Sequence, residues 1–204
     1  MHYGELTVGD TLVTVLEQRW IDAPVEALVL SANNRLALRG SSGNAAEIDA
    51  ACPELHGLLL ARGSEGVEPG NGAVTSGPGR QVIHAVTVVY RQSGSGPYAS
   101  TSTVASACEY ALAEAQRRRF TSLAFAPMCT RGHAAAVMDL SSAEIWMPRV
   151  QAGTICSYLR TGGFPCLRRV LLCLSPDPDG SASQRNRRMA EAFLEEARLF
   201  EEAS

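Results

Sequence analysis

Residues 25–45 read VEALVLSANNRLALRGSSGNA. The apolar run over Ala27–Ser31 predicts a buried strand, which ends at the pair Asn33-Asn34. A Gly/Ser-rich loop follows, and the Ala-rich segment Asn44–Ala51 predicts a short helix. The N-terminus of such a helix offers free backbone N–H groups and a positive dipole end, both of which attract phosphate. The two asparagines would present amides to ribose hydroxyls, although an asparagine pair after a strand is also ordinary turn chemistry.

A second stretch repeats this pattern of strand, small-residue loop and helix. The strand candidate Ser122–Ala126 leads into PMCTRGHAAA at residues 127–136. Ligands of open α/β sheets bind at the carboxyl ends of strands, so the two loops would lie side by side if their strands are neighbours. Arg131 and His133 would then stabilise a diphosphate or a carboxylate. The alternative is an exposed loop pair without a binding role.

The remaining pattern predicts the fold class. Further strands are expected at short apolar or β-branched runs, namely Gly4–Val8, Leu12–Leu16, Ala73–Ser76, Val82–Tyr90 and Val170–Leu174. Further helices are expected at Val104–Ala115 with Ser102 or Thr103 as N-cap, at Ser141–Leu159 with a break or kink at Pro148 and Gly153, and at residues 184–203. Alternating strands and helices predict a three-layer α/β/α sandwich with a mixed, mostly parallel sheet, forming one domain over residues 1–204.

Composition narrows the class of protein. The 204 residues are 46% hydrophobic with a formal net charge of -3, so neither global disorder nor general nucleic-acid affinity is expected. The six cysteines form no C-x-x-C pair, which predicts free thiols in a reducing compartment and no metal site. No signal peptide and no apolar stretch of bilayer length is found, so a cytoplasmic location is expected without a membrane partner.

Three separate blocks together resemble the macrodomain family. Val29-Leu30-Ser31-Ala32-Asn33 stands at the family's V-N-A-A-N motif, and Pro127 and Gly132 match its second loop, P-A-x-G-T-G-x-G-G. The family's middle motifs, G-x-A-x-x-T-x-G and V-I-H-x-V, are matched by Gly72, Ala73, Thr75, Gly77, Val82, Ile83, His84 and Val86. The resemblance covers roughly residues 13–174, and the order and spacing of the blocks are kept.

The resemblance implies a cleft for ADP-ribose, or for an ADP-ribosylated macromolecule, with no cofactor. It implies that Asn33 faces the distal ribose and that Gly40–Asn44 and Thr130–Ala134 wrap the diphosphate through backbone N–H groups. Family members are readers or hydrolases, and a hydrolase here would use substrate-assisted water attack at Asn33. The predicted ligand-binding residues are Trp20, Asp22, Ser31, Ala32, Asn34, Gly40, Ser41, Ser42, Gly43, Asn44, Thr130, Arg131, Gly132, His133 and Ala134.

The departures from the family pattern leave alternatives open. The family's adenine-side G-D-I falls on Gln18-Arg19-Trp20, so Asp22 would have to supply the carboxylate. Trp20 would stack on a base or lie in the core. No aspartate follows the first loop to activate water. A non-enzymatic interaction module, or a binder of a different nucleotide or of RNA ends, is therefore retained as an alternative. His84 and Cys129 are interpreted as structural.

Overall fold

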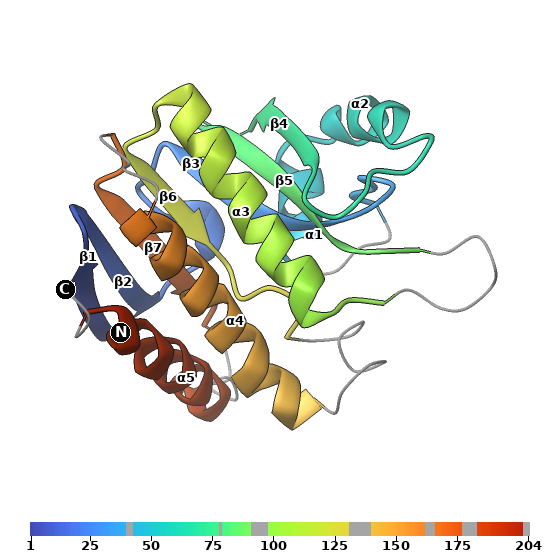
Figure 1. The fold of residues 1–204 in the computed structure, drawn as a ribbon. Helices are drawn as coiled ribbons and strands as arrows, with labels where there is room; N and C mark the ends of the chain where they lie inside the picture. Colours follow the sequence, from blue (N-terminus) through green and yellow to red (C-terminus); the bar gives the residue numbers. More distant parts are fainter. Residues whose placement is uncertain are drawn as a thin grey trace.

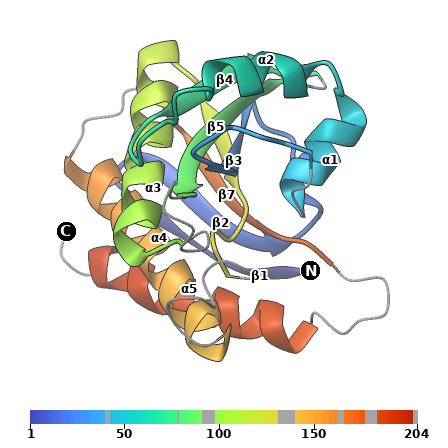
Figure 2. The same cartoon turned by 90° about the vertical axis from the view of Figure 1, so that its right-hand side faces the viewer.

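A computed structural model describes residues 1–39, 43–77, 79–90, 98–130, 140–161, 166–176 and 183–201. A sheet lies between two layers of helices (Figure 1). Figure 2 shows two helices on one side of the sheet, α1 (Asn44–Ala51) and α2 (Leu55–Arg62). The other side carries α3 (Thr101–Arg118), α4 (Leu140–Thr161) and α5 (Ser183–Glu201). The predicted three-layer α/β/α sandwich is confirmed.

The sheet has seven strands in the order β1-β2-β7-β6-β3-β5-β4. Their bounds are β1 His2–Val8, β2 Thr11–Glu17, β3 Ala27–Asn33, β4 Gly72–Ser76, β5 Gln81–Val88, β6 Ser122–Phe125 and β7 Arg169–Leu174. The five central strands pair in parallel, while β1 and β4 pair antiparallel at the two edges. The sheet is therefore mixed and mostly parallel, as the sequence predicts, and every predicted strand is present.

The continuous apolar runs are explained by burial on both faces. Alternate residues of β3 enter different cores: Val29 packs with α3, α4 and α5, whereas Leu28 and Leu30 pack toward α1 and α2. Strands covered on both faces lose the alternation of apolar and polar residues that a half-exposed sheet shows. No helix in the described part of the chain combines the length and apolar character needed to cross a bilayer.

The helices depart from prediction in three places. The N-cap of α3 is Ser100, which forms a capping box with Thr103, so both residues proposed as caps lie inside the helix. The helix α4 runs through Pro148 without a break, because burial between α3 and α5 compensates the hydrogen bond that proline removes. The helix α2 is not among the predicted elements; its buried stripe consists only of Leu55 and Leu59.

His84 on β5 is a core histidine, as interpreted from the sequence. Its side chain is buried, and Nε2 lies 2.8 Å from Oγ1 of Thr75 on the neighbouring strand β4. Burial, with a smaller effect of Arg62, lowers the pKa of His84 from 6.5 to about 4. The folded protein therefore holds the imidazole neutral at neutral pH.

We expect this histidine to make the fold acid-sensitive. Between pH 6.5 and 4 the unfolded chain binds a proton that the folded chain does not. The contribution of His84 to the free energy of unfolding is therefore fully present above pH 6.5 and is lost as the pH falls toward 4. The contribution lost between pH 7 and pH 5 is about 2 kcal/mol of the free energy of unfolding. Urea denaturation at both pH values should show this loss in the wild type and a correspondingly smaller one in His84→Gln. Equal pH responses of the two proteins would contradict the assignment.

Candidate functional site

The two strands that precede the predicted loops, β3 and β6, are neighbours in the sheet. These strands are parallel neighbours, with Ala27 opposite Leu123 and Val29 opposite Phe125, so their carboxyl ends meet at one edge of the sheet. The connection after β3 leads to α1 on one face, whereas the connection after β6 leads to α4 on the other face. Connections that diverge in this way leave a crevice at the switch point, which is where α/β sheets bind ligands. The condition on which the expectation of adjacent loops depends, that their strands are neighbours, is met.

The first loop follows β3, and its described start, residues 34–39, is held by Asn33. The side-chain Oδ1 accepts from the backbone N–H groups of Arg35 at 3.0 Å and Ala37 at 3.1 Å, and Nδ2 donates to the carbonyl of Ala37 at 2.8 Å. Leu36, inside this turn, is buried and takes a left-handed φ of 53°. The amide of Asn33 thus keeps one donor hydrogen for a ligand, while Oδ1 is occupied by the loop itself.

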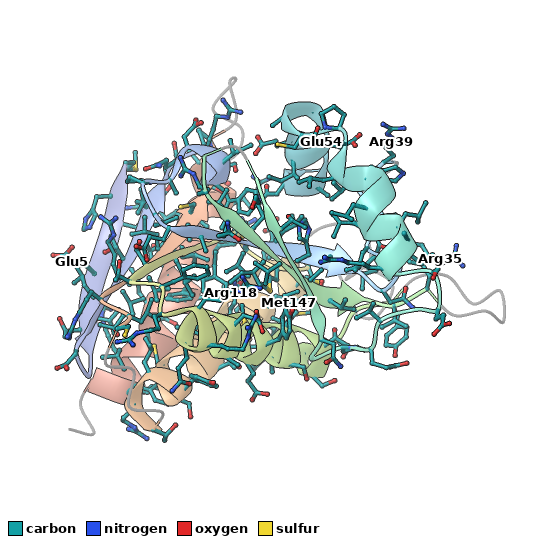
Figure 3. The ribbon with its side chains drawn as sticks, turned by 90° about the horizontal axis from the view of Figure 1, so that it is seen from above. Glu5, Arg35, Arg39, Glu54, Arg118 and Met147 are labelled. Carbon is teal, nitrogen blue, oxygen red and sulfur yellow. The ribbon has the colours of Figure 1, made fainter. Side chains whose placement is uncertain are left out.

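The side chain of the neighbouring Asn34 bonds to the backbone of Tyr90, two residues beyond the end of β5. Its Oδ1 accepts from the backbone N–H of Tyr90 at 2.9 Å and its Nδ2 donates to the Tyr90 carbonyl at 3.4 Å. The Arg35 guanidinium lies 5.7 Å from the Tyr90 ring centroid, and Figure 3 shows Arg35 and Arg39 at the periphery of the molecule. The side chain of Asn34 is therefore committed to fixing the ends of β3 and β5 relative to each other.

The backbone of Leu38 and Arg39 in the first loop is held by a side chain of α2. Nδ1 of His56 accepts from the backbone N–H groups of Leu38 at 3.3 Å and Arg39 at 3.2 Å. The Arg39 guanidinium also pairs with Asp49 of α1 at 3.6 Å. The backbone is thereby fixed up to the residue before the predicted phosphate-binding stretch.

The second loop follows β6, and its described start, residues 126–130, is held by Gln151 of α4. This side chain is completely buried; Oε1 accepts from the N–H of Met128 at 3.1 Å, and Nε2 donates to the carbonyl of Ala126 at 3.0 Å. Between these residues lies Pro127, which has no N–H to offer. Met128 is buried, so this clamp and the apolar core together fix the start of the loop.

A polar contact joins strands β3 and β5 to the second loop. The hydroxyl of Ser31 lies 2.5 Å from that of Thr87 and 3.9 Å from Sγ of Cys129, the second residue after Pro127. Cys129 has a left-handed φ of 54°, and burial raises its pKa. The protonated thiol dominates at neutral pH, so Cys129 is a structural contact, as interpreted from the sequence.

The predicted phosphate-binding residues fall partly inside the described chain. Gly43, at φ 62°, is the N-cap of α1, Asn44 is the half-buried first residue of the helix, and Thr130 is buried at the end of the described second loop. Ala32 is buried beside Ser31 in β3. The remaining predicted residues, Gly40, Ser41, Ser42, Arg131, Gly132, His133 and Ala134, lie outside the described residues.

The structure corrects the expectation that Trp20 stacks on a base. The ring is completely buried and Nε1 donates to the carbonyl of Ala124 at 3.0 Å, so no ring face is open to a ligand. Asp22 of the same short 3-10 helix (Trp20–Asp22) is exposed and pairs with Arg19 at 3.5 Å. Within the described ranges, no group of three His, Cys, Asp or Glu side chains is arranged to hold a metal ion.

The sequence did not point to Gln151 or His56, the side chains that hold the backbone of the second and the first loop. Gln151 carried a usable signal, since it stands at helical spacing between the buried Met147 and Ile155 and is therefore a polar residue on an apolar stripe. His56 carried none, because it follows Leu55 on a helix that was not predicted and its contact depends on the tertiary fold. The contact of Thr87 with Ser31 likewise depends on the pairing of β5 with β3, which the sequence does not give.

No protein-family model matches this sequence, and no curated protein matches it. Solved structures do match. The fold superposes on a mutant macrodomain of Oceanobacillus iheyensis with a TM-score of 0.72 and 18% identity, covering 98% of both chains. The chain has the macrodomain fold. The Trypanosoma brucei macrodomain matches with a TM-score of 0.60 and 18% identity over 90% of this chain and 65% of that one. The macrodomain of Thermus aquaticus DarG matches with a TM-score of 0.59 and 18% identity over 78% and 97%. Other matching Oceanobacillus macrodomain structures are described as a mutant with ADPR and as a complex with ADP.

Proposed function

We propose that this protein binds ADP-ribose, or a closely related nucleotide diphosphate, in the crevice between the first and second loops. The observation that carries the proposal is the divergence of these loops from the parallel neighbours β3 and β6, combined with side-chain clamps on both. Backbone that is already fixed beside a binding stretch lowers the cost of ordering the chain at the moment of binding. The ADPR and ADP complexes of matching macrodomains support the same choice of ligand.

The roles within the crevice follow from the residues present. Backbone N–H groups of Gly40–Asn44 and of Thr130–Ala134 bind the diphosphate, aided by the N-terminus of α1. Asn33 donates its remaining amide hydrogen to a ribose hydroxyl. Asp22 supplies a carboxylate on the adenine side, from its exposed position before β3.

Hydrolysis of an ADP-ribosyl bond is a narrower proposal, and the described residues favour binding over it. Oδ1 of Asn33 is occupied by two backbone N–H groups, so it accepts no bond from an attacking water in this conformation. The thiol of Cys129 is protonated at neutral pH. Release of ADP-ribose from a modified protein would nevertheless be the assay for this activity, and a partner carrying that modification would be its substrate.

Calorimetric titration tests the binding proposal. We expect ADP-ribose to bind more tightly than ADP, and ADP more tightly than AMP, with a matching order of increases in melting temperature. Ser42→Glu, which places a carboxylate at the predicted diphosphate position, should weaken ADP-ribose binding at least about tenfold. The matched control Thr7→Glu makes the same charge change on the exposed face of β1 and should leave binding unchanged. Failure of all three nucleotides to bind would favour an interaction module or another ligand.

A further inference from the structure

A hollow in the surface lies beside the start of the first loop. It has a volume of about 340 Å³, and it is lined by Asn34, Arg35, Leu60 and the turn residues 63–66, which follow α2. Most of these residues are exposed, so the hollow is open to solvent. Its volume stands at the lower end of the range of about 300–1,000 Å³ that is usual for ligand pockets. A hollow of this size suits a short segment of a larger molecule.

The walls of the hollow are joined to each other through backbone. The N–H of Val67 donates to the carbonyl of Asn34 at 2.7 Å. At Gly63 the turn approaches the loop so closely that a Cβ would lie 2.2 Å from the carbonyl oxygen of Arg35. The side chain of Asn34 in turn bonds the N–H and the carbonyl of Tyr90. The hollow is therefore formed before any ligand binds, which lowers the cost of ordering the chain.

The hollow lies at the ribose end of the proposed ligand. The strand β3 pairs with β6 on one side and with β5 on the other. The second loop follows β6, whereas Asn34 joins Tyr90 beyond the end of β5, so the hollow lies past Asn33 as seen from the second loop. Figure 3 shows Arg35 at the periphery of the molecule, where a large partner can reach it. A group attached to the ribose at Asn33 would extend toward this hollow.

The lining carries charges of both signs. The guanidinium of Arg35 stacks 5.7 Å from the ring centroid of Tyr90, and no carboxylate in the described part of the chain pairs with it. Glu65 is exposed and, among the described side chains, has no cation as a partner either. The last carbonyl groups of α2, which ends at Arg62, add partial negative charge at this end of the helix. The hollow therefore offers hydrogen-bond donors and acceptors together.

This combination suits a peptide main chain better than a nucleic acid. Each peptide unit presents one N–H donor and one carbonyl acceptor. A nucleic acid presents a phosphate at every nucleotide, and a carboxylate beside a helix C-terminus repels phosphate. Leu60, which is 43% exposed, adds an apolar contact that a peptide side chain can cover.

We propose that this hollow is the subsite for the polypeptide of an ADP-ribosylated protein, and that it holds the residues next to the modified one. The inference rests on the proposed function, because it starts from a ribose bound at Asn33. Arg35 donates to a peptide carbonyl, and Glu65 accepts from a peptide N–H. The subsite thereby distinguishes a modified protein from free ADP-ribose and from a modified nucleic acid.

Three probes test the proposal: ADP-ribose, a short peptide carrying ADP-ribose on a serine side chain, and a short single-stranded oligonucleotide carrying the same group. Calorimetry with the wild type should show the modified peptide binding about tenfold more tightly than ADP-ribose, because the hollow adds hydrogen bonds to charged groups. The oligonucleotide should bind no more tightly than ADP-ribose, since the hollow has no place for its phosphates.

Two variants assign this gain to the hollow. Arg35→Ala removes the guanidinium, and Ser64→Trp adds a large ring to the lining, so each should abolish the gain. The ratio of the dissociation constants for ADP-ribose and for the modified peptide is the readout, because it cancels any change in the crevice itself. The matched controls are Arg160→Ala, at an exposed arginine 5.2 Å from the ring centroid of Phe200, and Ser157→Trp, on the exposed face of α4. Both controls should keep the wild-type ratio.

The possible outcomes separate this inference from the proposed function. Binding of ADP-ribose without a gain for the modified peptide would overturn the inference and leave the function standing. A gain that survives in both Arg35→Ala and Ser64→Trp would place the peptide elsewhere and overturn it as well. A gain for the oligonucleotide as large as that for the peptide would make nucleic acid the partner instead. Absence of binding by all three probes would overturn the proposed function, and the inference with it.

Discussion

Replacing Gln151 with leucine should lower the free energy of unfolding by about 3 kcal/mol. The change deletes two hydrogen bonds at a completely buried side chain and leaves the carbonyl of Ala126 and the N–H of Met128 without their partner. Buried backbone groups that lose a partner cost their full desolvation, which exceeds the net value of an ordinary hydrogen bond. Because these groups begin the second loop, ADP-ribose affinity should fall together with stability.

The matched control for this prediction is Gln116→Leu. It makes the same chemical change at an exposed glutamine of α3, and its effect should stay within about 0.5 kcal/mol. Urea denaturation of both variants, followed by titration of ADP-ribose into the folded proteins, measures the two effects. A Gln151→Leu protein as stable as the control would show that Gln151 does not hold the loop.

A second large effect is expected at Gly63, the C-cap of α2. A Cβ built there would lie 2.2 Å from the carbonyl oxygen of Arg35 in the first loop, so the backbones of α2 and the loop approach as closely as glycine allows. Gly63→Ala must push the two backbones apart and should cost about 3 kcal/mol of stability. The same displacement separates α2 from the loop that it supports.

The helix α2 supplies its own control at Gly57. A Cβ at that exposed position meets nothing within 4 Å, so Gly57→Ala should stabilise the protein by about 0.5–1 kcal/mol through helix propensity. Thermal unfolding of the two variants should therefore move in opposite directions. A neutral Gly63→Ala would mean that the first loop does not rest on α2, and the support of the loop from this helix would have to be abandoned.

The sheet was predictable from sequence because strand burial leaves a local signal. Runs such as Ala27–Leu30 and Val170–Leu174 are apolar throughout, and both faces of these strands are covered in the structure. The short helix α2 was not predictable, since two leucines four residues apart are too little periodicity to distinguish a helix from a loop. The break that Pro148 allows for does not occur, because tertiary packing outweighs the local cost of proline.

The sequence predicted where in the fold the candidate site lies, but not what its side chains contact. Strand-loop-helix order located both loops, and strand pairing shows that the strands before them are neighbours. The sequence could not tell whether an asparagine would face a ligand or its own backbone, and the structure shows Asn33 and Asn34 bonding backbone. It also left Trp20 open between a ring stacked on a ligand and one in the core, where the structure places it.

The macrodomain fold here stands on matches at 17–18% identity to the Oceanobacillus structures, so the fold is shared while the loops have diverged. Serines have replaced much of the glycine expected in the first loop, which adds Cβ atoms where backbone approaches a phosphate but leaves each N–H in place. The side chains of Asn33, His56 and Gln151 hold the described backbone at the start of these loops.

A crystal structure of the protein soaked with ADP-ribose tests the central claim most directly. We expect the diphosphate to lie between residues 40–44 and 130–134, bound by backbone N–H groups, with a ribose hydroxyl near Nδ2 of Asn33. Ligand bound elsewhere on the protein, or a crevice filled by the side chains of the second loop with no ligand in it, would contradict the claim.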